Sequence, residues 1–294
     1  MDSNTFINAL LLCLLNVIFM VAGIFLNCVV IISLKRSSQL RKKLCYFMIL
    51  PLSCCDLAVV AINHPILISS TILWSMDTFD EDESKSMITW ISIIIGNLNG
   101  YSMSALLTLS VERFLALKYP FFHQTAVTKR KLLVFLLTFF LVITVSVLSL
   151  KLLHEKKYDN GLIIVFVLLF LFLFIFLNYN MLIIAKSKRK VERCGATHDP
   201  EKSKRRKLNF KNSSTCLMAV GCFFICSFPA IIYCALLLTS DTLSDERLNV
   251  IFRIGSSTLL VMNSTFNCLI FFWKNSILRR EGMKTVKYFQ SARS

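Results

Sequence analysis

Charged residues are scarce in this chain of 294 residues, and most of them carry the same sign. Asp, Glu, Lys and Arg make up 17% of the sequence, below the roughly 25% of an ordinary soluble domain. Apolar residues reach 55%, and the mean hydropathy is +0.65. One soluble core cannot use so much apolar sequence, so the composition excludes a soluble globular protein and indicates a membrane protein.

The sequence also lacks the features of several functional classes. It contains no arrangement typical of a hydrolase or transferase, and its four His residues lack the spacing of metal ligands. We therefore expect that the protein is not an enzyme. Internal repeats, low-complexity tracts and a separate soluble domain are absent as well, which argues against a transporter built from repeated halves.

Long apolar stretches account for the composition. A transmembrane helix needs about 20 mostly apolar residues, and seven stretches fit that length: 6–34, 44–74, 87–117, 132–150, 161–185, 216–238 and 248–273. Residues 275–289 then mix apolar and basic side chains, a pattern typical of an amphipathic helix on an anionic membrane surface. We expect an all-α fold, a single seven-transmembrane helix bundle over residues 1–294 with this short eighth helix.

The distribution of charge predicts how the bundle is oriented. The chain starts with MDSNTF, which has no basic residue, whereas KRSSQLRKK directly follows the first span. Counting onward places most Lys and Arg residues on one side of the membrane and the acidic segments 77–84 and 240–247 on the other. Basic loops face the cytoplasm, so we expect a multi-pass plasma-membrane protein with an extracellular N-terminus. The net charge of +16 then reflects contact with membrane lipids and needs no nucleic acid.

Polar residues inside the spans are candidates for a functional site. Asp56 is the only acidic residue deep in any span, where a lone carboxylate is costly unless it has partners. Candidate partners at similar depth are Asn27, Asn99, Ser102, Asn263 and Asn267. Turned inward, these residues would form a polar core able to hold water or a monovalent cation. The alternative is a set of interhelical hydrogen bonds, which we favour for Asn27.

A Glu-Arg pair ends the third span, in the stretch LTLSVERFLALKYP. Taken alone, Glu112 and Arg113 could be interfacial charges that reach out to water. The stretch nevertheless resembles the Glu/Asp-Arg-Tyr motif of rhodopsin-like (class A) G-protein-coupled receptors, with Phe114 in the place of Tyr. Other motifs of that family have counterparts in the same order: FLNCVV at Asn27, LSCCDLAVV at Asp56, Tyr179 in the fifth span, FFICSFP at Phe223, Cys226 and Pro229, and NSTFNCLIFF at Asn267.

Several positions depart from the family pattern. Ser227 stands for the usual sixth-helix Trp, Cys268 for the seventh-helix Pro, Phe271 for the Tyr after it, and Leu171 for the fifth-helix Pro. The second outer loop, about residues 151–160, is short and has no Cys to tie it to the third span. These features favour the branch of melanocortin, lysophospholipid, cannabinoid and adenosine-like receptors.

The resemblance implies a receptor that binds a ligand outside and activates heterotrimeric G proteins inside. The positions implied in coupling are Glu112, Arg113, Tyr179 and Asn209. The positions implied in the activation switch are Phe223, Cys226, Ser227, Pro229, Asn267 and Phe271. Many relatives carry an acid where Asn209 lies, so we expect Arg113 to pair only with Glu112, in a partly solvated ion pair. An allosteric sodium ion is implied at Asp56, Ser102, Asn263 and Asn267, and no other cofactor is expected.

The ligand class follows mainly from exclusion. Ile95 occupies the position that carries Asp in amine receptors, and Val261 the position of the retinal-binding Lys in opsins. Polar groups that could face an outer pocket are Asn63, His64, Asn99 and Tyr233, although His64 could equally be a hydrogen-bonded helix residue. The surrounding apolar residues favour a small lipid-like molecule, whereas the acidic segment 77–83 favours a cationic peptide. The sequence leaves both open.

Two other functions fit parts of the sequence. A non-signalling receptor-like protein, acting as a partner or trafficking subunit of another receptor, would explain the altered switch positions. A small-solute transporter would explain seven spans and an acid within the membrane, but neither repeats nor broken helices support it.

Overall fold

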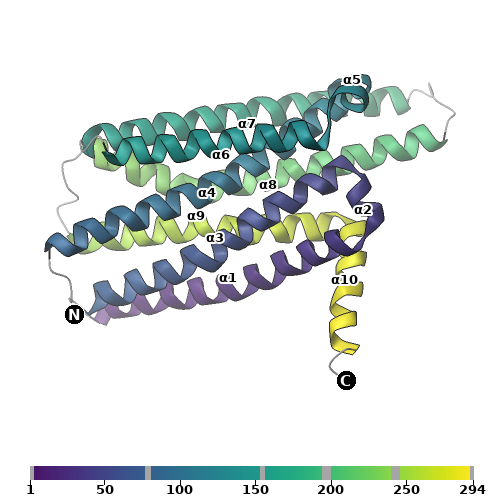
Figure 1. Cartoon of the computed structure of the whole chain (residues 1–294). Coiled ribbons are helices and arrows are strands. Elements are labelled where there is room, and N and C mark those ends of the chain that lie inside the picture. Colours follow the sequence, from purple (N-terminus) through teal and green to yellow (C-terminus); the bar gives the residue numbers. More distant parts are fainter. Residues whose placement is uncertain (1–2, 77–80, 153–155, 194–199, 240–245, 292–294) are drawn as a thin grey trace.

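The computed structural model describes residues 3–76, 81–152, 156–193, 200–239 and 246–291, where every regular element is a helix. Seven of the helices are long: α1 (Ser3–Arg36), α3 (Leu44–Ser75), α4 (Glu81–Lys118), α6 (Lys129–Leu152), α7 (Lys156–Arg193), α8 (Pro200–Thr239) and α9 (Glu246–Lys274). They run side by side as a bundle, and each contains one of the expected apolar stretches (Figure 1). The all-α bundle expected from the sequence is confirmed.

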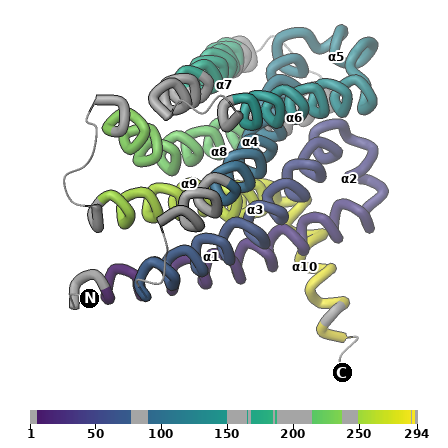
Figure 2. The backbone as a smooth tube through the Cα atoms, turned by 60° about the vertical axis from the view of Figure 1, so that its left-hand side comes forward, coloured from purple at the N-terminus to yellow at the C-terminus, as the bar shows by residue number. Residues whose placement is uncertain are grey.

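Three shorter helices lie at one end of the bundle, opposite the N-terminus (Figure 1). They are α2 (Ser38–Lys42), α5 (Pro120–Ala126) and α10 (Ser276–Ser291). Pro120 occupies the first turn of α5, where its missing N–H costs no helical hydrogen bond. Figure 2 shows α10 leaving the bundle at this end, as expected for a helix that lies along a membrane surface.

Two helices continue well beyond the apolar stretches that mark them in the sequence. α7 runs on through KSKRKVER, and α8 begins with PEKSKRRK. Lys, Arg and Glu have high helix propensity, so these polar segments extend a helix once the apolar part has formed it. Hydropathy alone therefore underestimates the length of both helices.

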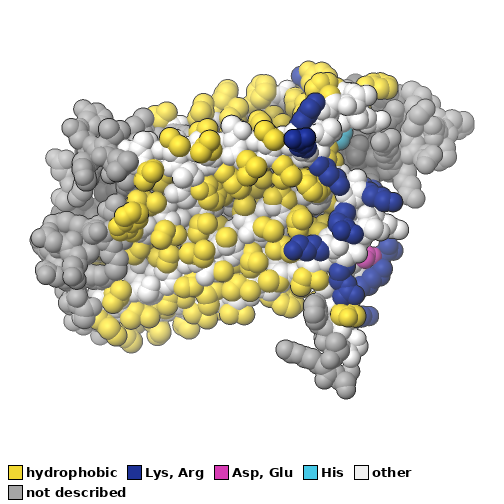
Figure 3. All heavy atoms as spheres, viewed as in Figure 1, with side chains coloured by type: hydrophobic (Ala, Val, Ile, Leu, Met, Phe, Trp, Pro, Cys, Tyr) yellow, Lys and Arg dark blue, Asp and Glu magenta, His cyan; other side chains and the backbone are white. Residues whose placement is uncertain are grey.

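The side chains on the surface of the bundle are distributed as a lipid bilayer requires. Within the described residues, five helices are long and apolar enough to cross a membrane: α1, α3, α6, α8 and α9. Large apolar side chains such as Phe25, Leu141 and Phe172 are more than half exposed on its sides. Figure 3 shows apolar side chains along the flank and Lys and Arg gathered at the end that carries α2 and α10. The chain is a multi-pass membrane protein with one strongly basic end.

Three helices approach one another closely at Gly23 of α1. A Cβ atom at this position would lie 2.5 Å from Thr265 Oγ1 of α9 and 2.8 Å from Val60 Cγ1 of α3. Thr265 also donates a hydrogen bond of 3.2 Å to the carbonyl oxygen of Phe19. Small residues allow such contacts in membranes, where apolar surface gives little drive for helices to associate. Gly23 therefore sets the spacing of α1, α3 and α9.

We expect Gly23→Ala to lower the free energy of unfolding by about 1–3 kcal/mol, because overpacking forces these helices apart. Reversible unfolding by SDS titration of the purified protein in mixed micelles measures the change. Gly221→Ala is the matched control, since a Cβ there meets no atom within 4 Å. Equal stability of the two variants would contradict the packing role of Gly23.

Candidate functional site

Asp56 lies in the middle of the bundle with only 1% of its surface exposed. Ser102 of α4 donates a hydrogen bond to its Oδ1 atom. Ser264 and Asn267 of α9 face the same carboxylate, although neither makes a hydrogen bond of ordinary geometry to it. The structure therefore brings together three of the helices that the sequence indicated, with Asp56 at their centre.

The side of this site formed by α9 carries buried polar atoms that are left without partners. Among the described residues, the oxygen atoms without a hydrogen bond here are Asn263 Oδ1, Ser264 Oγ and Asn267 Oδ1. Buried polar atoms normally find a partner, a water molecule or an ion. Carboxylate, hydroxyl and amide oxygens are the donors that a hard cation prefers. This donor set fits sodium, and Ser264 is an addition that the sequence analysis missed between Asn263 and Asn267.

Two other expected partners of Asp56 hydrogen-bond to their own helices instead. Asn27 Nδ2 donates to the carbonyl oxygen of Gly23 at 3.0 Å, and Asn99 Nδ2 to that of Ile95 at 2.9 Å. A short amide side chain easily reaches the carbonyl four residues before it. The interhelical hydrogen bond expected for Asn27 is absent from the described contacts, so that expectation was wrong.

Glu112 and Arg113 form a buried ion pair at the basic end of the bundle. Arg113 Nε donates to Glu112 Oε2, and Arg113 Nη2 donates to Glu112 Oε1. Glu112 is 0% exposed and Arg113 is 5% exposed. The expectation of a partly solvated pair was wrong, because the ends of α3 and α8 pack beside α4 here and leave only a small cavity next to Arg113.

His123 of α5 completes this cluster. Its Nε2 atom lies 2.8 Å from Glu112 Oε1, so α5 is tied directly to the buried carboxylate. The sequence analysis missed His123 because it lies beyond the third span, in a segment without apolar periodicity. Its only signal was the Tyr-Pro that precedes it, which starts a new helix and turns the chain back toward α4.

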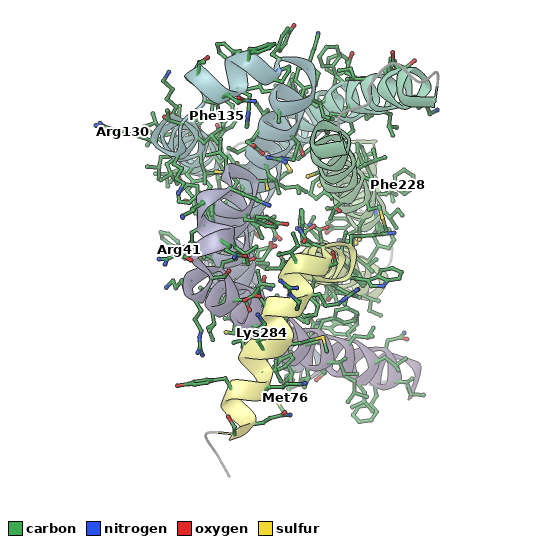
Figure 4. The ribbon with its side chains drawn as sticks, turned by 90° about the vertical axis from the view of Figure 1, so that its right-hand side faces the viewer. Arg41, Met76, Arg130, Phe135, Phe228 and Lys284 are labelled. Atoms are coloured by element: carbon green, nitrogen blue, oxygen red, sulfur yellow. The ribbon has the colours of Figure 1, made fainter. Side chains whose placement is uncertain are left out.

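A small cavity adjoins Arg113. It is lined by Cys45, Tyr46, Ile49, Leu109, Arg113, Thr215, Cys216, Phe271 and Asn275, from the ends of α3, α4, α8 and α9. The volume open to water-sized molecules is about 10 Å³, roughly what one water needs. Figure 4 looks onto this end of the bundle, with Arg41 and Arg130 at the edge of the bundle and Lys284 on α10. In this arrangement the cavity is too small to admit a segment of another protein.

The other two residues implied in coupling are not part of this cavity. Tyr179 of α7 is 63% exposed and does not line it. We expect Tyr179 to flank Arg113 only once this end of the bundle has opened, so that place stays a prediction. Asn209 belongs to α8, but its side chain lies outside the described residues.

The positions implied in the activation switch lie in the core between α7, α8 and α9. Phe223, Cys226, Ser227, Asn267 and Phe271 are all buried. Pro229 lies inside α8. The rings of Phe223 and Phe174 have their centroids 5.9 Å apart and join α8 to α7. Ser227 is 3% exposed, and no described residue makes a hydrogen bond to its Oγ atom.

The outer half of the bundle contains a hydrogen-bonded link across three helices. His64 Nδ1 of α3 lies 2.7 Å from Asn16 Oδ1 of α1, and Asn16 Nδ2 donates to Thr258 Oγ1 of α9 at 3.0 Å. Asn16 Nδ2 also donates to the Leu12 carbonyl oxygen at 2.8 Å. Because its amide nitrogen is the donor in both bonds, Asn16 Oδ1 must accept from His64. This arrangement favours the reading of His64 as a hydrogen-bonded helix residue, and Asn16 was missed.

The remaining outer-half candidates differ in their surroundings. Asn63 is fully buried, and neither polar atom of its side chain has a partner in the described structure. Ile95 packs against an apolar cluster that includes Val261. Tyr233 of α8 donates a hydrogen bond of 2.9 Å to Asn249 Oδ1 of α9.

Residues 26–271 match the sequence model of the family described as "7 transmembrane receptor (rhodopsin family)". The chain belongs to the rhodopsin family of seven-transmembrane receptors. No curated protein shows a significant match to the chain. The match contains Asp56, Glu112, Arg113 and Phe271 with the helices that position them.

Membership of the rhodopsin family identifies the chain as a G-protein-coupled receptor. Receptors of this family are in general not enzymes, in agreement with the absence of a catalytic arrangement in the sequence. The buried Glu112–Arg113 pair and the carboxylate of Asp56 lie at two depths of one bundle. The first lies at its basic end and the second at its middle.

Burial makes the ion pair of the receptor costly to disrupt. We expect Glu112→Ala to lower the free energy of unfolding by about 3–5 kcal/mol, because Arg113 would remain buried without its partner. The same SDS titration measures this loss. Glu281→Ala is the control: Glu281 pairs with the exposed Lys284 at 2.8 Å, and a surface pair contributes only about 0–1 kcal/mol. Similar losses in both variants would contradict the burial of Glu112.

Proposed function

We propose that this receptor binds an extracellular ligand in the outer half of its bundle and activates heterotrimeric G proteins at its basic end. The observation that carries the proposal is the buried Glu112–Arg113–His123 cluster beside a cavity at that end. A basic end faces the cytoplasm under the positive-inside rule. The receptor would then lie in the plasma membrane with its N-terminus outside.

The coupling mechanism follows from the size of the cavity. With space for about one water, the cavity excludes a G protein from Arg113. The helices that line it must separate before Arg113 can contact a partner. A G protein that binds only the separated arrangement shifts the equilibrium toward it, and a ligand outside does the same if it prefers that arrangement. Glu112 and His123 oppose this change by holding Arg113 and α5 in place.

The outer half favours a small apolar ligand with few polar groups. Asn63 of α3 offers a buried amide without a described partner. Other residues of α3 belong to an apolar cluster with Val261, against which Ile95 packs. Pockets that are mostly apolar, with a few polar groups, are typical of sites for small molecules. A cationic peptide attracted by the acidic segment 77–83 is the second ligand class, but this segment lies partly outside the described residues and its side chains entirely so.

A non-signalling role, as a partner or trafficking subunit of another receptor, is the second candidate function. The altered switch favours it: Ser227 and Phe271 are buried in the core without the groups that the family usually has there. A partner protein needs the bundle but not the separation of its cytoplasmic ends. The two functions therefore differ in whether purified receptor promotes nucleotide exchange.

Arg113→Ala tests the proposed function directly. We expect the variant to lose nucleotide exchange on purified G proteins while it still reaches the cell surface, because Arg113 is the residue that the partner must contact. The assay uses receptor in nanodiscs at matched amounts of folded protein. Arg253→Ala, on α9 in the outer half, is the control and should retain exchange. Full exchange by Arg113→Ala would make the Glu-Arg pair a purely structural anchor.

A sodium ion at Asp56 is a separate proposal about regulation. Asp56, Ser102, Asn263, Ser264 and Asn267 would hold the ion through their oxygen atoms, and the ion would supply a positive charge that pairs with the carboxylate. Such an ion satisfies the buried oxygens only while α3, α4 and α9 stay together. It should therefore favour the arrangement described above.

We expect sodium to raise the thermal unfolding midpoint of the receptor relative to choline at equal ionic strength, because an ion that binds only the folded state stabilises it. Asp56→Asn should abolish the difference, since it removes the charge that attracts the cation. Asn178→Ala, a buried residue that bonds only to its own helix at Phe174, should retain it. A sodium effect that persists in Asp56→Asn would exclude this site.

A further inference from the structure

Tyr46 carries a buried hydroxyl at the cytoplasmic end of α3. The side chain is 1% exposed, and its hydroxyl donates a hydrogen bond of 3.1 Å to Asn275 Oδ1. The same Oδ1 accepts from the backbone N–H groups of Ile277 and Leu278 at 3.2 and 3.3 Å. Backbone N–H groups can only donate, so Oδ1 is an acceptor and Tyr46 must be a donor.

Asn275 is the residue that joins α9 to α10. Its backbone N–H donates to the Phe271 carbonyl oxygen at 3.1 Å, and its own carbonyl oxygen accepts from Arg279 N at 2.9 Å. Its side chain satisfies two of the free N–H groups in the first turn of α10, as an N-cap residue does. The hydrogen bond from Tyr46 therefore ties the end of α9 and the start of α10 to α3 at one point.

This link lies beside the ion pair. Tyr46, Asn275, Arg113 and Phe271 all line the same cavity. Phe271 is buried and has no hydroxyl, so it cannot make a polar link from α9 at this level. The Tyr46 hydroxyl joins two walls of the cavity, α3 and the junction of α9 with α10, whose separation would enlarge it.

We propose that Tyr46 is a positioning residue of the coupling switch. Its hydrogen bond to Asn275 holds α3 and the α9–α10 junction together and so restrains the opening that exposes Arg113. This inference rests on the proposed coupling function. It assigns to Tyr46 and Asn275 the polar link at this level of the bundle, which the buried Phe271 side chain cannot make because it has no hydroxyl.

The test is basal nucleotide exchange without ligand, measured on purified G proteins with receptor in phosphatidylcholine and phosphatidylglycerol nanodiscs. Tyr46→Phe removes one oxygen atom and keeps the ring, and we expect it to raise exchange about 2- to 13-fold, the equivalent of one net hydrogen bond. Asn275→Ser keeps a side chain that caps α10 but is too short to reach Tyr46, so the same increase is expected. The double variant should show no further increase, because both changes remove one interaction.

Tyr101→Phe is the matched control. Tyr101 forms a hydrogen bond of 2.6 Å with Thr144 between α4 and α6, away from the cavity. Its removal should lower stability without raising exchange per folded receptor, which separates a general loss of stability from loss of the restraint. Two results would overturn the inference. One is equal exchange by Tyr46→Phe and Tyr101→Phe. The other is an additive increase in the double variant of Tyr46→Phe and Asn275→Ser.

The same measurements distinguish this inference from the proposed function. Exchange by the wild-type receptor that depends on Arg113 but does not change in Tyr46→Phe overturns only the role of Tyr46. Absence of exchange in the wild type and in every variant, with folded protein and all families of G protein, overturns the coupling function and this inference with it.

Discussion

A fully buried carboxylate at the basic end of the bundle constrains the rest of this receptor. Glu112 has no exposed surface, and an unpaired charge in such a place would cost several kcal/mol. Arg113 supplies the opposite charge from the same helix, and His123 brings α5 against the same oxygen. Residues of α3 and α8 line the small cavity beside the pair, which has space for about one water. If this end couples to a G protein as proposed, its packing and its coupling are parts of one equilibrium.

Helix α3 provides the polar contact at each of three depths. His64 bonds to Asn16 in the outer half, Asp56 accepts from Ser102 in the middle, and Tyr46 donates to Asn275 at the basic end. Apolar surface drives helix association weakly in a bilayer, so interhelical hydrogen bonds and close packing set the arrangement. None of these three hydrogen bonds of α3 involves the altered switch residues Ser227 and Phe271.

The part of the candidate site that could be predicted from the sequence consists of polar side chains within the apolar spans. Asp56 and Ser102 could be paired from the sequence because an acid in hydrocarbon needs partners at the same depth. Asn16 was missed although it lies in an apolar span, since its partners His64 and Thr258 are far apart in the chain. His123 gave no comparable signal. Tyr179 is 63% exposed in the described arrangement, and its expected place beside Arg113 in an opened bundle stays a prediction.

The sequence by itself determined the all-α fold, the positions of the seven apolar helices and the basic end, since all three follow from hydropathy and charge along the chain. Tertiary structure decided the burial of the Glu112–Arg113 pair and its contact with α5. It also decided that Asn27 bonds to its own helix rather than to a neighbour. Local pattern gives the depth of a residue in the membrane. Its partner depends on the rotation and spacing of the helices, which arise from close contacts such as that of Gly23 with Val60 and Thr265.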